Sequence, residues 1–475
     1  MNRFVFAAVL VGYASIMIPV ASAQNTGRSE GSTGGVSQQV LVPRAPQNGK
    51  VFVPESDKAQ PGFAHTTYLL RSADGNKPTA MTSPVAEGVN PSITYSQGAE
   101  FPNSMGCIYV KSPVSAGCKP AFASGPSAAG YGAIAIVDAY DNPNAASDVT
   151  TFNAEWPLAA TSFTKIYANG NGSCSTPPAD PNWALEESLD IEWAHVFAPN
   201  AAIILVEACS NSDTDLFYAE QVAFNYIVDN YPAGGQVTNS WQGAEFSGQT
   251  ADDPFFADFH YAGATGYKTH IQAFASSGDY GYEGVTTGYP SGNPWVISAG
   301  GTSVYRNSAN GSYAYEGCWS GSGGGVSTQE TYATTFGGGN MGPWANFQFP
   351  IFGKSSRVTP DLSFNADPAS GVYVYSGYNG GWYVVGGTSV SSPSLAGIIN
   401  RANNRLGTAF LTPITGGNDY FNTEENNLIY SQLATYSAYK TNFYDVTKGS
   451  NGGPAVTTSY DECTGVGSPR GLLGK

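Results

Sequence analysis

The sequence predicts an α/β fold in which a mainly parallel central sheet is covered by helices on both faces. Continuously apolar strands are typical of a sheet that is buried on both sides, and helical segments between such strands are typical of parallel connections. The runs that predict buried strands are Ala133–Asp138, Ala201–Ala208, Gln236–Trp241, His270–Ala275 and Trp295–Gly300. In sheets of this kind, functional side chains gather at the carboxyl ends of the strands.

The helices between these strands are expected at Leu185–Phe197 and Phe217–Asn230. In the C-terminal third, Val372–Tyr375 and Trp382–Val385 flank a glycine-containing turn, which predicts a hairpin. A further helix is expected from about Pro393 to Leu406. No repeat of solenoid period is evident, so one large domain is the expected organisation.

The chain begins with the pattern of a secretory signal. Met1-Asn2-Arg3 gives a short basic start, residues 4–20 are almost wholly apolar, and Ala21-Ser22-Ala23 provides small residues for cleavage before Gln24. A signal peptide over residues 1–23 is therefore expected, and the mature protein is expected to be secreted, either extracellular or periplasmic.

Residues 24–90 are expected to form a leader or reduced propeptide, because their Gly-, Ser-, Gln- and Pro-rich sequence has little apolar periodicity. This segment is expected to be largely irregular apart from a weakly strand-like patch at Ala64–Leu70. The large α/β domain is expected to occupy residues 91–475.

Composition excludes several classes of partner. The 475 residues hold 36 acidic and 20 basic side chains, for a net charge of −16, and a nucleic-acid-binding protein needs the opposite sign. After the signal, no segment approaches the roughly 18 consecutive apolar residues of a membrane span. We therefore expect no nucleic-acid or membrane partner. A monomer is the expected state, although the sequence leaves the oligomeric state open. The acidic excess fits a protein that works in acid, although carboxylates that only maintain solubility would give the same balance.

The chain has 6 cysteines, and an even number in an exported protein predicts up to three disulfides. Cys107 and Cys118 are the expected local pair, and the other pairings stay open. No Cys-x-x-Cys spacing occurs, which disfavours zinc binding and thiol redox chemistry.

A repeated sequence indicates a nucleophile. Gly-Gly-Thr-Ser-Val occurs at 300–304 and again at 386–390, but only the second copy continues into a helical sequence with Pro393 near its start. Ser389 therefore stands at a strand-to-helix junction, where the backbone N–H groups of a helix start can face developing negative charge. Ser389 is the better nucleophile of the two serines.

A carboxylate, rather than a histidine, is the expected base for this serine. The four histidines, none in a His-Gly-Thr-His setting, are His65, His195, His260 and His270. On a helix, Glu186 and Asp190 would share one face, although a solvated acidic face has the same spacing. Asp279 directly follows a buried strand and, if protonated near Ser389, could donate to an oxyanion; in isolation it could equally be a turn residue.

Together these motifs resemble those of the sedolisin family, the serine-carboxyl peptidases with a subtilisin-like fold. Within that family the resemblance is to the kumamolisin-like members. The similar segments are Glu186-x-x-x-Asp190, Ser276-Ser277-Gly278-Asp279 and Gly386-Gly387-Thr388-Ser389-x-x-x-Pro393. The resemblance implies that Ser389 attacks the scissile carbonyl, Glu186 takes and returns the proton, Asp190 orients Glu186, and Asp279 stabilises the oxyanion. It also implies acid activity on proteins or peptides.

Weaker matches extend the resemblance. Asp138 ends an apolar strand at the place where an acidic residue can extend the family's hydrogen-bond network. Ser240-Trp241 is similar to the family's Ser-Trp-Gly strand, which lines the substrate cleft, and Gln242 replaces the expected glycine. The shape of that subsite is therefore expected to differ.

The C-terminal region resembles the family's calcium site. Ca²⁺ prefers six or more oxygen ligands, including backbone carbonyls. By the resemblance, side-chain oxygens would come from Asp445 and Asp461, and carbonyl oxygens from Val446, Thr457 and Ser459. Without the resemblance, two aspartates in glycine-rich loops would be interpreted as turn formers.

Two other functions stay open. A glycoside hydrolase would also combine secretion, 13% aromatic residues and paired carboxylates, but its two carboxyls must flank a bond at about 5–9.5 Å. Carboxylates one turn apart on a single helix suit this poorly. A non-catalytic, calcium-stabilised surface module on the same fold is the other alternative, and it predicts that Ser389→Ala changes no function.

Overall fold

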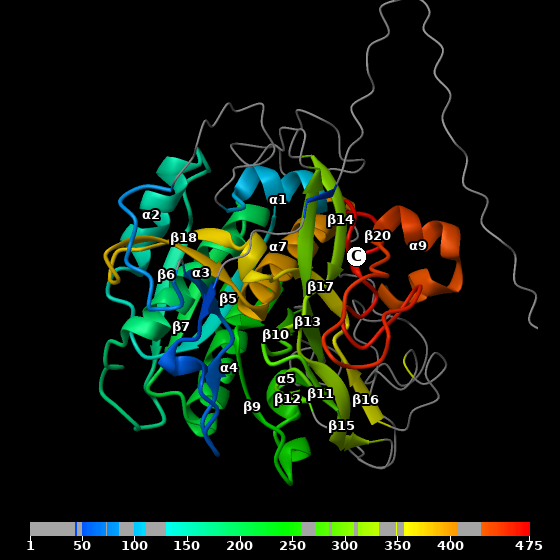
Figure 1. The fold of residues 1–475 in the computed structure, drawn as a ribbon. Helices are drawn as coiled ribbons and strands as arrows, with labels where there is room; N and C mark the ends of the chain where they lie inside the picture. Colours follow the sequence, from blue (N-terminus) through cyan, green and yellow to red (C-terminus); the bar gives the residue numbers. More distant parts are fainter. Residues whose placement is uncertain are drawn as a thin grey trace, which may run out of the picture. The chain divides into compact units, whose positions relative to one another are not determined.

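The computed structural model describes residues 43–44, 50–72, 74–84, 99–110, 130–257, 271–284, 287–307, 312–331, 348, 356–406 and 429–475. All of them belong to one compact unit, Leu41–Lys475 (Figure 1). The expected signal segment at residues 1–23 lies outside the described residues.

A nine-stranded sheet of described residues forms the centre of this unit, with the order β1-β13-β10-β8-β5-β7-β6 and with β14 and β17 also paired to β13. The strands β10, β8, β5, β7 and β6 run parallel to their neighbours, as predicted. The bounds are β1 Pro43–Arg44, β5 Ala133–Ala139, β6 Phe163–Ala168, β7 Ala202–Ala208, β8 Gly235–Asn239, β10 Ile271–Ser276, β13 Val296–Asn307, β14 Tyr313–Cys318 and β17 Leu362–Asn365.

Strand β5 shows why the central strands are apolar throughout. Ile134 and Ile136 point into one hydrophobic core, whereas Ala133, Ala135 and Val137 point into a second core on the opposite face. Side chains alternate between the two faces of a strand, so a strand that is covered on both faces needs apolar residues at every position.

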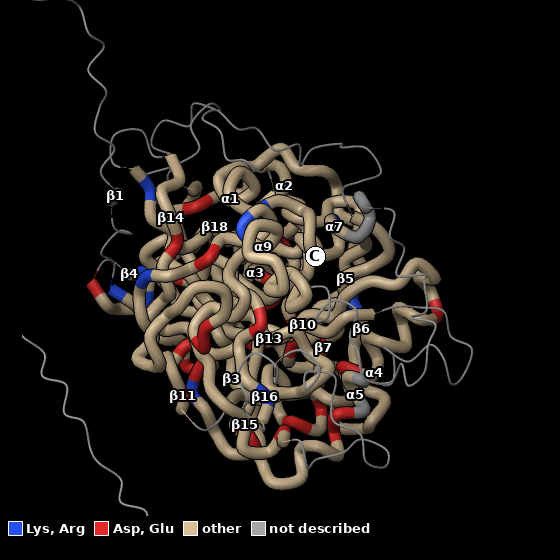
Figure 2. The backbone as a smooth tube through the Cα atoms, turned by 90° about the vertical axis from the view of Figure 1, so that its right-hand side faces the viewer, with Lys and Arg blue, Asp and Glu red and all other residues tan. Residues whose placement is uncertain are grey.

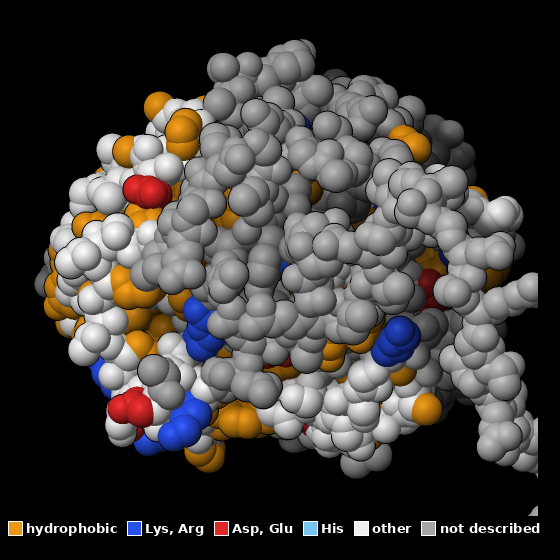
Figure 3. Space-filling view, turned by 45° about the horizontal axis from the view of Figure 1, so that its top comes forward, with side chains coloured by type: hydrophobic (Ala, Val, Ile, Leu, Met, Phe, Trp, Pro, Cys, Tyr) orange, Lys and Arg blue, Asp and Glu red, His pale blue; other side chains and the backbone are white. Residues whose placement is uncertain are grey.

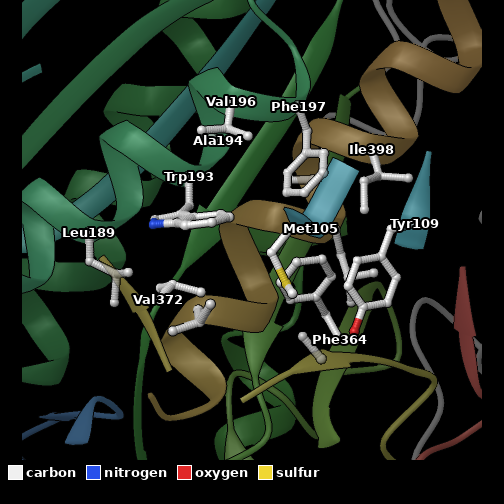
Figure 4. Close-up of a cluster of buried hydrophobic side chains, with 14 of the residues drawn as sticks. Met105, Tyr109, Leu189, Trp193, Ala194, Val196, Phe197, Phe364, Val372 and Ile398 are labelled. Atoms are coloured by element: carbon white, nitrogen blue, oxygen red, sulfur yellow. The ribbon is translucent and has the colours of Figure 1, made fainter. Parts of the chain in front are cut away.

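Three long helices cover these faces. The first core contains side chains of α3 (Pro181–Phe197) and α7 (Thr388–Leu406), and the second contains side chains of α4 (Asp213–Asn230). Figure 4 shows Trp193 and Phe197 of α3 in the same cluster as Ile398 of α7. The rings of Phe197 and Phe364 meet edge to face at 5.5 Å, an arrangement that aromatic pairs favour.

Local sequence fixes where α3 begins. The carboxylate of Asp180 accepts hydrogen bonds from the backbone N–H groups of Asn182 and Trp183, and Pro181 occupies the first turn. Such a cap satisfies donors that the helix leaves free, and proline costs nothing at a position that needs no N–H. This start places Glu186 and Asp190 in the second and third turns.

Several boundaries differ from the prediction, and two of these differences bear on the site. Strand β8 ends at Asn239, and Trp241 begins a separate strand, β9 (Trp241–Ala244). Helix α7 begins at Thr388 rather than near Pro393. Pro393 lacks the N–H that would bond the Ser389 carbonyl in a regular helix, and the Ser240 hydroxyl lies 3.3 Å from that oxygen.

The expected boundary near residue 91 does not separate a leader from the domain in the described residues. Strands β2 (Lys50–Phe52) and β4 (Leu69–Ser72) extend a sheet of order β18-β19-β4-β2, and β3 (His65–Thr66) pairs with β9. Residues 50–72 are therefore more regular than predicted, because their backbone groups bond to strands of the large domain. The other two strands are the predicted hairpin, β18 Val372–Ser376 and β19 Gly381–Gly386.

The remaining elements lie around this frame: α1 Pro102–Tyr109, α2 Ala145–Glu155, α5 Pro254–Ala257, α9 Tyr436–Asn442, β11 Tyr282–Gly284, β12 Gly288–Tyr289, β15 Gly324–Thr331, β16 Ser356–Thr359, β20 Phe443–Tyr444 and β21 Ser468–Pro469. Disulfides join Cys174 to Cys209 and Cys318 to Cys463. Cys107 is also disulfide-bonded, and its expected partner Cys118 lies outside the described residues.

The described surface carries few charges. In Figure 3, uncharged side chains and backbone cover most of the described part of one face, and the charged side chains are scattered. In the tube view, Asp and Glu positions outnumber Lys and Arg positions (Figure 2). Among the described residues, no helix is both long and apolar enough to cross a lipid bilayer.

Candidate active site

Ser389 lies in the first turn of α7, immediately after β19. Its hydroxyl donates to Glu186 Oε2 at 2.9 Å and also lies 3.2 Å from the carbonyl oxygen of Ser240. Gly387 makes the tight turn before it with φ +101°, a conformation that favours glycine. The serine therefore has a carboxylate as its hydrogen-bond acceptor, as the sequence predicted.

Glu186 and Asp190 lie one turn apart on α3 and are both fully buried. Asp190 interacts with the side chain of Glu186, and its Oδ1 accepts the Ser240 hydroxyl at 2.9 Å. Glu186 Oε1 and Asp190 Oδ2 are buried and have no hydrogen-bond partner unless a proton lies on one of the carboxyls. Burial raises the pKa of both groups, and in Glu186 the nearby charges of Asp190 and Asp138 raise the pKa further.

Asp138 lies near the carboxyl end of β5, as expected. It is fully buried, and neither of its carboxylate oxygens has a hydrogen-bond partner. Burial is the main cause that raises its pKa, followed by the charges of Asp190 and Glu207. The site therefore contains several carboxyls that cannot all be ionised at once, and it keeps protons that isolated carboxyls would lose.

Asp279 follows β10 and faces the start of α7. Its Oδ1 accepts hydrogen bonds from the backbone N–H of Thr388 at 2.7 Å and from the Thr388 hydroxyl at 2.9 Å. Its Oδ2 is buried without a partner. Burial raises the pKa of Asp279 well above its ordinary value, with a smaller contribution from the charge of Asp57. The raised pKa favours the protonated form of Asp279, and Oδ2 is the oxygen without a partner.

Ser240, Trp241 and Gln242 contribute differently to the site. The Ser240 hydroxyl and carbonyl both face the Ser389–Asp190 region. The Trp241 side chain is buried in the second core, where its Nε1 donates to the Val137 carbonyl at 2.8 Å. The backbone of Trp241 pairs with Thr66 of β3. Gln242 Oε1 is buried with no partner.

Neither of the two described histidines is hydrogen-bonded to Ser389. His65 Nδ1 lies 3.1 Å from Asp57 Oδ1. His195 is buried on α3, where its Nε2 contacts the Ala159 carbonyl at 2.9 Å and burial lowers its pKa to about 4. His260 and His270 lie outside the described residues.

Two residues that contact the site were not predicted from the sequence. Thr388 donates two hydrogen bonds to Asp279. Its place beside Ser389 in the motif is a signal that could have indicated this role. Thr67 lies in the expected leader, yet its Oγ1 is 2.9 Å from Ser389 Oγ. Only the strand-like pattern around Thr67 was visible in the sequence, and that pattern carries no information about its distant partner.

The structure brings part of the expected calcium site together. Asp445 Oδ1 accepts the Ser459 N–H at 2.9 Å, and the Tyr439 hydroxyl lies 3.2 Å from Asp445 Oδ1, 2.9 Å from the Ser459 carbonyl and 2.8 Å from the Val466 carbonyl. One hydroxyl proton can satisfy only one of these three oxygens. Burial, with a smaller contribution from Asp445, raises the pKa of Asp461 to about 6.

Within the described part of the chain, no hydrogen bond joins the carbonyls of Val446 and Thr457, the other two expected ligands, to this cluster. Among the described residues, no group of three or more His, Cys, Asp and Glu side chains could hold a metal ion. An ion here would therefore depend on backbone carbonyls as well as on the two aspartates.

Comparison with known proteins supports the resemblance. The chain is 31% identical over 323 residues to kumamolisin of Bacillus sp. (strain MN-32), covering 64% of this chain and 52% of that protein. It is 30% identical over 269 residues to sedolisin of Pseudomonas sp. (strain 101), covering 52% of this chain and 41% of that protein. The chain thus spans about half the length of the curated relatives it matches. No protein-family model matches the chain.

A solved structure of Pseudomonas sedolisin, described as a serine-carboxyl proteinase complexed with two molecules of pseudo-iodotyrostatin, matches with a TM-score of 0.57 and 23% identity. The match covers 78% of this chain and 95% of that one. It confirms the predicted subtilisin-like α/β fold. In sequence, the chain is similar to kumamolisin and sedolisin, both members of the sedolisin family.

Proposed function

We propose that this protein is an acid-active serine-type endopeptidase in which Ser389, Glu186 and Asp190 form the catalytic triad and Asp279 contributes to the oxyanion hole. The observation that carries this proposal is the 2.9 Å hydrogen bond from Ser389 Oγ to Glu186 Oε2. A nucleophile needs an acceptor within hydrogen-bond reach. The similarity to kumamolisin and sedolisin supports the same reaction.

In this mechanism the buried carboxyls have opposite tasks. Glu186 accepts the Ser389 proton as Oγ attacks the scissile carbonyl, and it then returns the proton to the leaving amine. Asp190 orients Glu186 while the Ser240 hydroxyl holds Asp190. The negative oxygen of the tetrahedral intermediate receives hydrogen bonds from the Ser389 backbone N–H and from protonated Asp279. Water then hydrolyses the ester on Ser389 by the same proton transfers in reverse order.

Acid activity follows from these tasks. Glu186 must lose its proton to act as the base, so activity rises with pH as Glu186 ionises. Asp279 must keep its proton to act as a donor, so activity falls when Asp279 ionises. Burial raises the pKa of both groups, so activity in acid requires that Glu186 ionises at a lower pH than Asp279. The resulting pH profile is bell-shaped.

Hydrolysis of a denatured protein from about pH 3 to pH 8 tests this proposal. We expect an acid optimum in the wild type and loss of activity in Ser389→Ala and in Glu186→Gln, which preserves the side-chain volume. Glu192→Gln is the matched control, because Glu192 is a buried carboxyl of the same helix that accepts the Tyr375 N–H at 3.1 Å. A neutral optimum that survives Glu186→Gln would reject the carboxylate base.

The same experiment addresses the two alternatives. A non-catalytic surface module predicts no hydrolysis at any pH and no effect of Ser389→Ala. A glycoside hydrolase predicts cleavage of a polysaccharide, but Glu186 is already hydrogen-bonded to Ser389, and a sugar hydrolase would give that serine no role. Peptide hydrolysis that requires both residues would exclude both alternatives.

We further propose that Ca²⁺ binds at the C-terminal loops through Asp445 and Asp461 and the carbonyls of Val446, Thr457 and Ser459. The support is the oxygen-rich cluster around the Tyr439 hydroxyl, where three acceptors share one donor. Such a hard oxygen environment suits Ca²⁺, which would neutralise the two carboxylates and tie the loops together.

Chelation tests the calcium proposal through stability. We expect a chelator to lower the melting temperature of inactive Ser389→Ala protein, since an ion at about 100 times its Kd stabilises the folded state by about 2.7 kcal/mol. Asp445→Asn should remove this dependence, whereas Asp229→Asn, an exposed aspartate on α4, should leave it intact. An identical melting temperature with and without the chelator would reject the site.

Secretion and peptide substrates complete the proposal. The two described disulfides, Cys174–Cys209 and Cys318–Cys463, support an oxidising compartment outside the cytosol. Protein or peptide chains are the expected substrates of a monomeric enzyme. The N-terminal residue of the secreted Ser389→Ala protein would test cleavage before Gln24, because this variant cannot process itself.

A further inference from the structure

The Gln242 side chain fills the space between its own strand, β9, and two glycines of neighbouring segments. A Cβ atom built on Gly278 would lie 3.0 Å from Gln242 Cδ, and one built on Gly288 would lie 2.7 Å from the same atom. Non-bonded carbon atoms need about 3.5–4.0 Å. Both glycine positions therefore have no room for a side chain as long as the glutamine is present.

Gln242 points to the side of β9 on which the reaction centre lies. Successive side chains of an extended strand point to opposite sides. Trp241 points into the second core, so Gln242 points the other way. Ser240, two residues before it, also points that way, because its hydroxyl bonds the Asp190 carboxylate and its carbonyl oxygen lies 3.2 Å from Ser389 Oγ.

The wall opposite Gln242 also leads to the reaction centre. Gly278 directly precedes Asp279, and both of its backbone groups are held: its N–H donates to Thr388 Oγ1 at 3.0 Å, and its carbonyl accepts the Gly323 N–H at 2.7 Å. A carbonyl under attack must lie between Ser389 and Asp279. The substrate side chain beside that carbonyl is therefore expected to point toward the space between β9 and Gly278.

The Gln242 amide has an oxygen to offer to such a side chain. Gln242 is only 4% exposed, and its Oε1 has no hydrogen-bond partner. Its side chain hydrogen-bonds the Glu283 carboxyl, which uses the NH₂ group, the only donor that a glutamine side chain has. A buried oxygen without a donor is costly. A substrate side chain that brings a donor would remove this cost.

An uncharged donor suits this oxygen. Burial raises the pKa of Glu283 to about 7, although the hydrogen bond from Gln242 and the charge of His65 oppose this shift. In acid the Glu283 carboxyl is therefore protonated, and it supplies no negative charge that would attract a lysine or arginine side chain.

We propose that Gln242 selects the substrate residue on the acyl side of the cleaved bond, favouring a small side chain with a hydroxyl or amide donor, such as Thr, Ser or Asn, over a large aromatic one. This inference rests on the proposed peptidase function. The filled space excludes large side chains, and the unpaired oxygen selects the donor. A glycine at this position, as in the Ser-Trp-Gly strand that the segment resembles, would provide neither feature.

Hydrolysis of four quenched peptides at about pH 4 tests the inference. The peptides are identical except at one position, which is Thr, Val, Phe or Lys, and mass spectrometry identifies the bond that is cut. Thr and Val have the same shape and differ in the hydroxyl donor. The wild type should cut after Thr with a kcat/KM about 3–10-fold higher than after Val, and its kcat/KM should be lowest for Phe.

Two variants separate the effect of the filled space from that of the oxygen. Gln242→Gly should raise kcat/KM for the Phe peptide about tenfold or more and should abolish the preference for Thr over Val. Gln242→Leu, which keeps the space filled without an oxygen, should still reject Phe but lose the preference for Thr. Gln329→Leu is the matched control on β15, where the amide donates to the Thr328 hydroxyl at 3.1 Å, and it should change neither ratio. Circular dichroism monitors the folding of each variant.

The outcomes separate this inference from the proposed function. A wild type that cuts the Phe or Lys peptide fastest would overturn the inference and leave the peptidase function intact. A Thr-to-Val ratio that is the same in the wild type and in both variants would also overturn it. The wild-type ratios need no substitution, so they decide the matter even where a variant does not fold. If the wild type hydrolyses neither these peptides nor a denatured protein, the peptidase function fails and the inference fails with it.

Discussion

Glu220 offers a test of how a buried carboxyl makes the stability of this protein depend on pH. It lies on α4, is fully buried, and accepts one hydrogen bond, from Asn239 Nδ2 at 3.3 Å. Its other oxygen has no partner. Burial raises its pKa to about 8 from an ordinary value of 4.5, opposed by the bond from Asn239. Near neutral pH, the folded state therefore still holds a proton on Glu220 that the unfolded chain has already released.

The size of the effect follows from linkage. For a carboxyl whose pKa is raised on folding, stability is fully present below the unfolded pKa and is lost as the pH rises toward the folded pKa. Each pH step between the two values costs about 1.4 kcal/mol. Between an unfolded pKa of 4.5 and pH 7, with the folded pKa at about 8, folding with Glu220 loses roughly 3 kcal/mol.

Glu220→Gln removes this cost while keeping the side-chain volume and the oxygen that faces Asn239. Urea unfolding in a Ser389→Ala background, which prevents self-digestion, should show a gain of roughly 3 kcal/mol at about pH 7 and almost none at about pH 4. Glu155→Gln, at an exposed position on α2, should change stability at neither pH. An equal change at both pH values would refute the linkage argument, because only a titrating group gives a pH-dependent difference.

Three other predictions concern the site and the core. Asp279→Ala should lower kcat by about 10²–10³-fold. Asp279→Asn, whose amide donates at every pH, should stay active and extend the pH profile of activity toward neutral pH. A pH profile that is unchanged in Asp279→Asn would contradict the role of Asp279 as a protonated donor. Arg357 and Asp361 form a fully buried pair at 2.7 Å, so Arg357→Met should cost about 3–5 kcal/mol in urea unfolding. Replacing Cys318 and Cys463 by Ala should cost about 2–5 kcal/mol in urea unfolding, and an unchanged free energy of unfolding would contradict this expectation.

Much of the fold was predictable because its determinants are local in sequence. Strand β5 is apolar at almost every position, and its residues Ile134 and Val137 contact cores on opposite faces of the sheet. Helix spacing alone placed Glu186 and Asp190 together. Ser389 was recognisable because one copy of the repeated pentapeptide precedes a helix and the other does not.

The rest depended on contacts that no local pattern encodes. Thr67 and Ser389 are 322 residues apart in sequence, and their meeting depends on the register of β3 against β9. The start of α7 was misjudged because Pro393 normally indicates a first turn. Inside the helix it leaves the Ser389 carbonyl without a helical donor, and the nearest hydroxyl, that of Ser240 at 3.3 Å, comes from a distant part of the sequence.

The buried carboxyls connect stability with catalysis. Helix α3 alone carries Glu186, Glu187, Asp190 and Glu192 at full burial, and burial raises the pKa of each. Ionising them together would place several like charges in the core. A rise in pH therefore lowers the stability of the fold and also removes the proton from Asp279. A version of this enzyme for neutral pH would therefore need two kinds of change. Asp279→Asn would restore the oxyanion donor, and neutral residues at Glu187 and Glu192 would limit the charge that the core has to hold.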